Sequence, residues 1–256
     1  MVGVVPRSGA PSRRSETRPN HPWKLATWNT CGAVPTMKTL MATLPNPPDV
    51  LVRTETRNSH KTGCAVEIHL ISERARNAPI IEEKVITRRI RKTTLLVADQ
   101  KVSIIGCYSP TAKDILGQLD VLETLSYEIG AIDHQWFLLG DFNAQLPRSR
   151  TSKSVGRYLT NTSPNQSGRD LLSYLETNSW VAVNSLFVKK RSRLATYITS
   201  HPGLKVIGSR KESQRRPHYL TIDFIICHER DRKVVTNCQS DWQPALLRWG
   251  IKRDHA

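Results

Sequence analysis

The segment QWFLLGDFN, residues 135–143, constrains the fold of this chain more than any other stretch. Its four consecutive apolar side chains, from Trp136 to Leu139, leave no polar face, so a strand formed here must be covered on both sides. An acid and an amide, Asp141 and Asn143, follow the apolar run directly. Because a strand buried on both faces needs a layer on each side, this pattern favours a layered α/β architecture.

Comparable apolar runs recur along the chain and are expected to form strands. They occupy residues 23–29, 49–55, 63–71, 93–99, 102–110, 135–141, 180–185, 195–199 and 220–227. Two further stretches have leucines and isoleucine at helical spacing. These predicted helices cover residues 112–132, with Leu116, Leu119, Leu122, Leu125 and Ile129, and residues 168–178, with Leu171, Leu172 and Leu175.

Composition indicates one globular domain preceded by a tail. With 38% hydrophobic residues among 256, the chain can bury a single core, and no apolar run approaches the roughly 18 residues of a membrane span. Residues 1–22 are rich in Pro, Ser and Arg and are expected to be a disordered basic tail, with the domain at 23–256.

The five cysteines lack the close pairing of zinc sites, which indicates reduced thiols in a nuclear or cytoplasmic protein, neither secreted nor in a membrane.

The charge is strongly positive, with 38 Lys plus Arg against 22 Asp plus Glu and a formal net charge of +16. Such a balance favours a polyanionic partner. The excess is clustered at residues 7–14, 86–92, 146–153, 188–193 and 209–218. A single cluster is usually a solvated surface, but five in one domain favour contact with a phosphate backbone. We expect Arg148, Arg150, Arg191 and Arg193 to bind such a substrate.

Polar residues recur where the predicted strands end. Each has an ordinary explanation, because Asp and Asn often form turns, a strand Glu is usually solvated, and a Tyr before Ser-Pro usually packs. Together they could converge on one edge of a sheet, where rigid strand ends can hold oxygen ligands for a hard cation. The residues are Asn29, Glu55, Tyr108, Asp141, Asn143 and, inside its strand, Asp223.

Taken in order, these segments resemble the motifs of the endonuclease/exonuclease/phosphatase superfamily, which are metal-dependent phosphodiesterases and phosphatases. The matching stretches are TWNTCG, PPDVLVRTET, CYSP, LLGDFNA, TIDFI and KRDHA, and they extend from residue 23 to the end. Gly-Asp-Phe-Asn after an apolar strand is the most specific. The resemblance implies an α/β four-layer sandwich, in which two packed mixed β-sheets are flanked by helices.

Within that superfamily the chain most resembles the endonuclease domains of non-LTR retrotransposons, including craniofacial-development-protein-like relatives. The stretches SPNQSGRDLLSYLETNSWVAVNSLF and RRPHYLTIDFIICHERDRKVVTNCQ carry this likeness. It implies an Mg2+-dependent (or Mn2+-dependent) DNA endonuclease that leaves a 3′-hydroxyl, with DNA as partner and no small-molecule cofactor. The reverse transcriptase that normally follows such domains is absent from this chain.

The same resemblance implies a role for each matching residue. Glu55 would hold the metal ion, assisted by Asn29, and Asp141 would orient the attacking water. Asn143 would donate to a phosphate oxygen, and Tyr108 would contact the phosphate or assist the leaving group.

The resemblance also implies that His255 acts as general base or phosphate contact, oriented by Asp223 or Asp254. Asp254 lies 31 residues beyond Asp223 (254 minus 223), close to the family interval, whereas the rival Asp241, followed by Trp242, lies only 18 beyond (241 minus 223). With this alignment the strand that should follow His255 is missing from the domain.

Other departures from the family pattern are milder. Thr54 replaces the Gln that precedes the metal-binding Glu, and Thr221 and Phe224 replace Gln and Tyr around Asp223. Two alternatives to the endonuclease remain open. One is another phosphatase or nuclease of the superfamily, acting on abasic sites or phosphoinositides, and the other is a catalytically impaired nucleic-acid-binding remnant.

Overall fold

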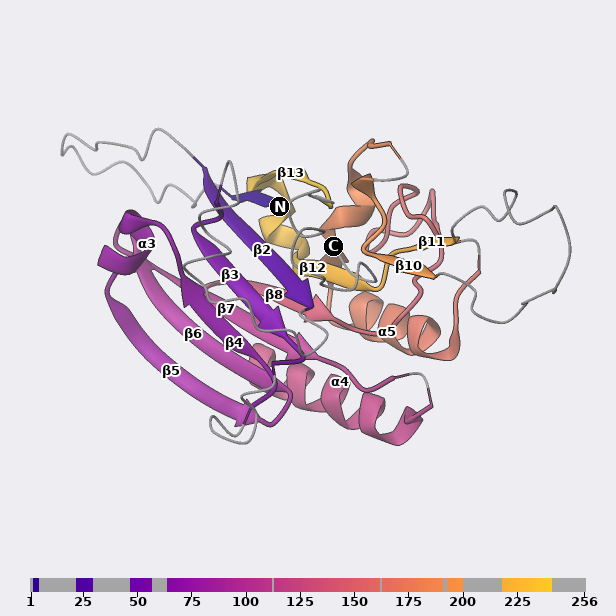
Figure 1. The fold of residues 1–256 in the computed structure, drawn as a ribbon, viewed down its shortest axis with the longest axis horizontal. Coiled ribbons are helices and arrows are strands. Elements are labelled where there is room, and N and C mark those ends of the chain that lie inside the picture. Colours follow the sequence, from indigo (N-terminus) through magenta and orange to yellow (C-terminus); the bar gives the residue numbers. More distant parts are fainter. Residues whose placement is uncertain are drawn as a thin grey trace, which may run out of the picture.

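The structure is a computed structural model that describes residues 2–4, 22–29, 47–56, 64–111, 113–161, 163–190, 193–199 and 218–240. Among these residues the strands form one five-stranded sheet, one six-stranded sheet and a small two-stranded sheet. The two large sheets pack face to face, and two long helices cover the outer face of the larger one (Figure 1). This arrangement confirms the prediction of packed mixed sheets with flanking helices.

The five-stranded sheet has the order β13-β1-β2-β3-β4, and only β2 and β3 run parallel within it. Its strands are β1 (Val2–Val4), β2 (Trp23–Asn29), β3 (Val50–Thr54), β4 (Glu67–Leu70) and β13 (Val235–Cys238). The short helix α3 (Glu73–Asn77) follows β4.

The six-stranded sheet has the order β5-β6-β7-β8-β12-β9, with β7 and β8 parallel and the other pairs antiparallel. Its strands are β5 (Ile80–Thr87), β6 (Ile90–Val97), β7 (Gln100–Tyr108), β8 (Gln135–Asp141), β9 (Trp180–Ala182) and β12 (Asp223–His228). The described residues also form β10 (Tyr197–Thr199), which pairs with β11 (His218–Leu220), and the 3-10 helices η1 (Val183–Leu186) and η4 (Glu229–Val234).

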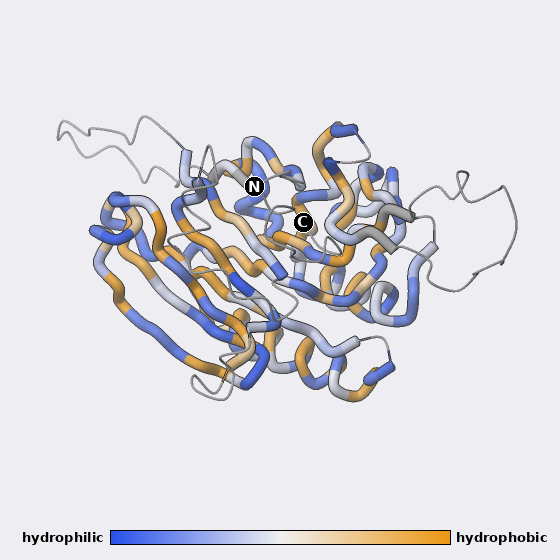
Figure 2. The backbone as a smooth tube through the Cα atoms, in the orientation of Figure 1, coloured by the Kyte–Doolittle hydropathy of each residue, from blue (hydrophilic) through white to orange (hydrophobic). Residues whose placement is uncertain are grey.

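The apolar segment of β8 is explained by the two hydrophobic cores that the strand contacts, one on each face. Phe137 and Leu139 belong to the core between the two sheets, whereas Trp136 and Leu138 belong to the core beneath the helices. Successive strand residues point to opposite faces, so a strand at the centre of a layered fold needs apolar residues throughout. In Figure 2 hydrophobic stretches accordingly follow the strands of both sheets.

The two long helices are α4 (Ile115–Gly130) and α5 (Gln166–Thr177). Of the residues at helical spacing in α4, Leu122, Leu125 and Ile129 are buried, whereas Leu116 is 80% exposed. The helix instead buries Gln118 and Val121. Leu116 lies in the first turn, beyond the part of the helix that covers the sheet.

Of the predicted disordered tail, residues 1–22, the structure describes residues 2–4 and Pro22, and residue 1 and residues 5–21 lie outside the described part. Within it, however, residues 2–4 form β1, which pairs antiparallel with β13 on one side and β2 on the other. These three residues are therefore part of the five-stranded sheet. The pairing is between segments distant in sequence, which a local pattern does not reveal.

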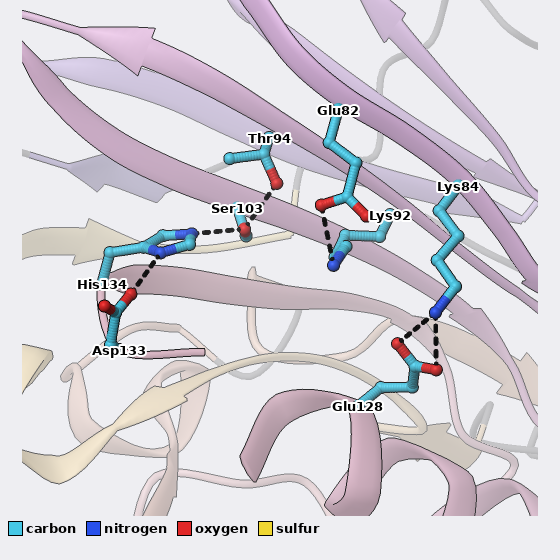
Figure 3. Close-up of polar contacts among 8 residues, drawn as sticks. All are labelled: Glu82, Lys84, Lys92, Thr94, Ser103, Glu128, Asp133 and His134. Carbon is cyan, nitrogen blue, oxygen red and sulfur yellow. Dashed lines mark hydrogen bonds and ion pairs between the residues drawn. The ribbon is translucent and has the colours of Figure 1, made fainter. Parts of the chain in front are cut away.

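The polar contacts in Figure 3 lie on the helix-facing side of the six-stranded sheet, at its β5–β6–β7 part. Lys84 of β5 pairs with Glu128 of α4 at 2.9 Å, and Lys92 of β6 pairs with Glu82 of β5 at 3.0 Å. These pairs are partly exposed and contribute little stability individually.

The four described cysteines Cys64, Cys107, Cys227 and Cys238 are buried and form no disulfide with one another. Burial raises the pKa of the Cys227 thiol to about 12 and that of Cys238 to about 11, so both are protonated at neutral pH. No helix within the described ranges is long and apolar enough to cross a membrane.

Candidate functional site

Strand registers bring several of the predicted site residues together at one end of the two sheets. Asp141, the last residue of β8, is the Cα partner of Tyr108 on parallel β7 and of Asp223 on antiparallel β12. The inward face of β8 carries Phe137 and Leu139, so Asp141, two residues further on, points to the space between the sheets. In Figure 1 these strand ends meet near the centre of the molecule, beside the end of β2.

One hydrogen bond connects the two sheets at this point. The side-chain amide of Asn29, the last residue of β2, donates to Oδ2 of Asp141 at 2.8 Å. Asn29 is 2% exposed and Asp141 is 1% exposed, so the carboxylate is held by the amide in surroundings of low dielectric, where such a bond is stronger than in water.

A second contact connects β3 with β7. The Tyr108 hydroxyl donates to Oε1 of Glu55 at 2.5 Å. Burial raises the pKa of Tyr108 above its usual value, and the bond to Glu55 and the nearby Asp141 carboxylate raise it further. The phenol therefore keeps its proton at neutral pH and acts as a hydrogen-bond donor.

The loop after β8 is folded back onto its own aspartate. The backbone N–H of Asn143 donates to Oδ1 of Asp141 at 2.8 Å, and the Asn143 side-chain amide donates to the carbonyl of Ser109 at 2.9 Å. Both oxygens of Asp141 are thus engaged, one by Asn29 and one by Asn143. The orientation of the carboxylate is fixed before any substrate arrives.

Two of the site residues have left-handed backbones. Glu55 has φ of 53° and Asn143 has φ of 49°. Such conformations are uncommon for residues other than glycine and persist where the surroundings enforce them, which happens often at functional sites. Here they turn the chain sharply at the ends of β3 and β8 and direct these two side chains toward the strand-end cluster.

Asp223 is buried, and its backbone is held by two residues that sequence analysis did not single out. Thr196 Oγ1 accepts from the backbone N–H of Asp223 at 3.0 Å, and the Asn184 side chain donates to the Asp223 carbonyl at 2.9 Å. Both residues are distant from Asp223 in sequence, and neither belongs to a motif that the sequence analysis could recognise.

Arg89 is a further residue that sequence analysis did not assign to the site. Its guanidinium lies 5.3 Å from the centroid of the Tyr108 ring, and its carbonyl accepts from the Tyr108 backbone N–H at 2.9 Å. It sits in the basic segment 86–92, but nothing in that segment distinguishes it from the neighbouring Arg88 and Arg91. Arg89 places positive charge beside the carboxylates of the site.

The predicted substrate-binding arginines are described in part. Arg148, Arg150 and Arg193 are exposed. Arg148 donates to the Thr160 carbonyl at 3.2 Å, and Arg193 donates to the Gln239 side chain at 3.2 Å. Arg191, Asp254 and His255 lie outside the described residues, as does the rival motif around Trp242.

The donor chemistry of the site fits a hard divalent cation. Glu55 supplies a carboxylate and Asn29 an amide oxygen, and Mg2+ is commonly bound through one or two carboxylates together with waters and substrate phosphates. Within the described ranges, no group of three or more His, Cys, Asp or Glu residues could form an all-protein cage for a metal ion.

Another chain of polar side chains has the order of an acyl-transfer triad. Asp133 contacts His134 Nδ1 at 3.0 Å, and His134 Nε2 contacts Ser103 Oγ at 2.8 Å (Figure 3). Ser103 is 0% exposed and also shares a 2.9 Å hydrogen bond with Thr94. A hydroxyl sealed inside the sheet cannot reach a substrate, so this network serves to satisfy buried polar groups.

Comparison with solved structures identifies the fold. The endonuclease domain of TRAS1, a telomere-specific non-LTR retrotransposon, matches with a TM-score of 0.57 and 12% identity over 82% of this chain and 86% of that one. An AP endonuclease from Archaeoglobus fulgidus matches with a TM-score of 0.54 and 15% identity over 91% and 95%. The 3′ phosphatase NExo from Neisseria, bound to a product DNA hairpin, matches with 0.53 and 14% over 82% and 88%.

The chain therefore shares its fold with these three structures, which is the fold that its motif resemblance implied. No protein-family model and no curated protein matches the sequence.

Proposed function

We propose that this protein is a metal-dependent DNA endonuclease of the non-LTR retrotransposon type, which hydrolyses a phosphodiester bond and leaves a 3′-hydroxyl. The observation that carries the proposal is the connected set at the strand ends. Asn29 and Asn143 each bind one oxygen of Asp141, and Tyr108, beside Asp141 in the sheet, binds Glu55.

Each described residue has a task that its contacts support. Asp141, with its orientation fixed by two donors, accepts a hydrogen bond from the attacking water and holds it in line with the phosphorus. The Asn143 amide has a second hydrogen besides the one directed at Ser109, and it donates this to a phosphate oxygen. Tyr108 is protonated at neutral pH, and when Glu55 turns to a metal ion its hydroxyl hydrogen would be released from Glu55 and donated to the phosphate or to the leaving oxygen.

Glu55 and Asn29 would hold Mg2+ or Mn2+, and the ion would supply positive charge against the developing charge on the phosphate. A role for His255 as general base, oriented by Asp223 or Asp254, stays part of the proposal and follows from the motif alone. Loss of the His255 side chain would then lower the rate by roughly a hundredfold to ten-thousandfold, which is what acid-base catalysis usually contributes.

The choice of DNA as substrate rests on charge and on likeness. The formal net charge is +16, and Arg89 adds a guanidinium over the Tyr108 ring at the edge of the site. We expect Arg148, Arg150, Arg191 and Arg193 to contact the phosphate backbone. The Neisseria 3′ phosphatase was solved with a DNA hairpin. A Danio rerio TDP2 structure was solved with a single-stranded DNA product, and it matches with a TM-score of 0.52 and 13% identity over 80% of this chain and 83% of that one.

The substrate class can be tested with three DNAs incubated with the purified protein and Mg2+. They are supercoiled plasmid, a duplex with one abasic site, and a duplex with a 3′-phosphate end. The proposal predicts plasmid nicking, and the nick should be extended by a DNA polymerase without further treatment because it carries a 3′-hydroxyl. Activity confined to the abasic duplex or to the 3′-phosphate would assign another branch of the superfamily. Salt-sensitive DNA binding without any cleavage would indicate a binding module.

A further inference from the structure

The side chain of Asn165 connects helix α5 to the loop that carries Asn143. Its Oδ1 accepts from the backbone N–H of Gly168 at 2.8 Å, which caps the helix, and also from the backbone N–H of Gln145 at 2.8 Å. Its Nδ2 donates to the carbonyl of Asn143 at 3.1 Å. A capping residue needs only the first of these three bonds. The other two go to the loop on either side of Ala144.

The helix end and the loop are also in close steric contact. A Cβ atom added to Gly168 would lie 2.0 Å from the carbonyl oxygen of Gln145. Glycine at this position therefore lets the first turn of α5 lie directly against the backbone of the loop. The hydrogen bonds from Asn165 act across this contact.

The other side of Asn143 is tied to the same helix by a second route. The Asn143 amide donates to the Ser109 carbonyl at 2.9 Å. The neighbouring Pro110 carbonyl accepts from the Gln118 side chain at 2.8 Å, and Gln118 Oε1 accepts from the Ser167 hydroxyl at 2.6 Å. Gln118 and Ser167 are both buried. Two sets of hydrogen bonds, both starting at the N-terminal end of α5, therefore hold the loop from either side.

From this geometry we infer that Asn165 is a positioning residue for the reaction, which fixes the Asn143 backbone and thereby aims the Asn143 side chain at the substrate phosphate. The left-handed φ of 49° at Asn143 is a conformation that needs such support. The Asn165 side chain binds the carbonyl of Asn143, and the Asp141 carboxylate binds the backbone N–H of Asn143. The inference rests on the proposed function, because it assigns a role in that same site.

The variant Asn165→Asp separates capping from positioning. Aspartate is as good a helix cap as asparagine, so it keeps the bonds from Gly168 and Gln145. It cannot donate to the Asn143 carbonyl, and it sets a second oxygen against that carbonyl instead. We expect kcat for plasmid nicking to fall by about 10- to 100-fold, as small displacements of a catalytic group do, with KM within about twofold of wild type.

Two further variants complete the comparison. Asn165→Ala removes all three bonds and should lower both thermal stability and kcat. Asp114→Ala is the matched control, because Asp114 caps α4 through the Gly117 N–H at 3.0 Å and has an exposed position. It should lower stability and leave kcat unchanged. If Asn165→Asp nicks like wild type, or if Asp114→Ala loses as much kcat as Asn165→Ala, the positioning role is refuted.

Hydrogen exchange of the Gln145 amide gives a readout that does not depend on activity. The amide should stay protected in wild type and in Asn165→Asp and should exchange at least about tenfold faster in Asn165→Ala, because an unbonded amide is no longer shielded. If wild type shows no nicking but this exchange pattern holds, the proposed function fails while the ordering of the loop by Asn165 stands. Equal exchange in all three proteins would overturn the inference.

Discussion

The Asn29 side-chain amide donates to Asp141 Oδ2 at 2.8 Å, and this contact connects the ends of β2 and β8 across the two sheets. It joins residues 112 positions apart in sequence. The site therefore exists only when both sheets are packed. Replacing the Asn29 amide by a carboxylate would therefore place two acids in hydrogen-bonding contact.

We predict that Asn29→Asp moves the acidic limb of the pH–rate profile for nicking upward by at least about one pH unit. Two carboxylates this close cannot both ionise near neutral pH, so they share a proton and Asp141 is ionised only at higher pH. The measurement is kcat between pH 5 and 9. Asn77→Asp, an exposed substitution in α3, is the control, and an unchanged profile in Asn29→Asp would contradict the role given to Asp141.

Removal of the Tyr108 hydroxyl should slow the reaction. Tyr108→Phe loses the 2.5 Å bond to Glu55. The proposed bond from this hydroxyl to the phosphate or leaving oxygen would also be lost, and if such a bond to a charged group stabilises the transition state by about 1.5 to 3 kcal/mol, kcat should fall by about 10- to 150-fold. Tyr127→Phe is the control, because Tyr127 is 80% exposed on α4. Equal rates for the two variants would exclude Tyr108 from the reaction.

Gly140→Ala should prevent correct folding of the site. An added Cβ would lie 1.8 Å from the carbonyl oxygen of Cys107 on the adjacent strand, and Gly140 has a φ of 155°. The clash is with backbone in the middle of a sheet, so the two strands must separate. We expect thermal denaturation to show a large loss of stability or no cooperative transition. Gly130→Ala, which meets nothing within 4 Å, should fold normally.

The Asp49–Arg74 pair should make stability depend on acid pH. Arg74 Nε donates to Asp49 Oδ1 at 2.7 Å and its Nη2 binds Oδ2 of the same group. Burial of Asp49 opposes ionisation, but the bonds from Arg74, Ser72 and Lys24 prevail, and the pKa of Asp49 is lowered. Asp49→Asn should therefore lower the free energy of unfolding at pH 7, by about 1 to 3 kcal/mol.

The sign of this effect follows from the lowered pKa. The stabilisation is fully present above the unfolded value of about 3.9 and is lost as the pH falls through the lower folded pKa. The difference between wild type and Asp49→Asn in urea denaturation should thus be constant from pH 5 to 7 and shrink below about pH 4. Asp120→Asn, on an exposed face, should differ little from wild type at any of these pH values, and a gap that widens in acid for Asp49→Asn would contradict the argument.

The sequence predicted the central strands well because they are buried on both faces. The bounds expected for β2 and β8, residues 23–29 and 135–141, are those of the structure. β5 was missed because its six leading residues are all exposed and the strand has no apolar face of its own. β1 was missed because three residues pair with partners far away in sequence.

The site was partly predictable for a related reason. Asn29, Glu55, Tyr108, Asp141 and Asn143 belong to local motifs at strand ends, and strand pairing then brings them together. Arg89 and Asn165 act through contacts between segments that no local pattern connects. Arg89 is one of several arginines in its segment, and Asn165 is an ordinary helix cap until its bonds to the loop are seen.

The most direct test of the central claim is nicking of supercoiled plasmid by wild type, Glu55→Gln and Asp141→Asn, in Mg2+ and in EDTA, with DNA binding measured alongside. Wild type should nick only with the metal, and each variant should lose at least about a hundredfold in rate while DNA binding stays. Glu83→Gln and Asp120→Asn, both exposed, should behave as wild type. Nicking that survives EDTA, or that persists at the wild-type rate in Asp141→Asn, would contradict the assignment of this strand-end set as a metal-dependent hydrolytic centre.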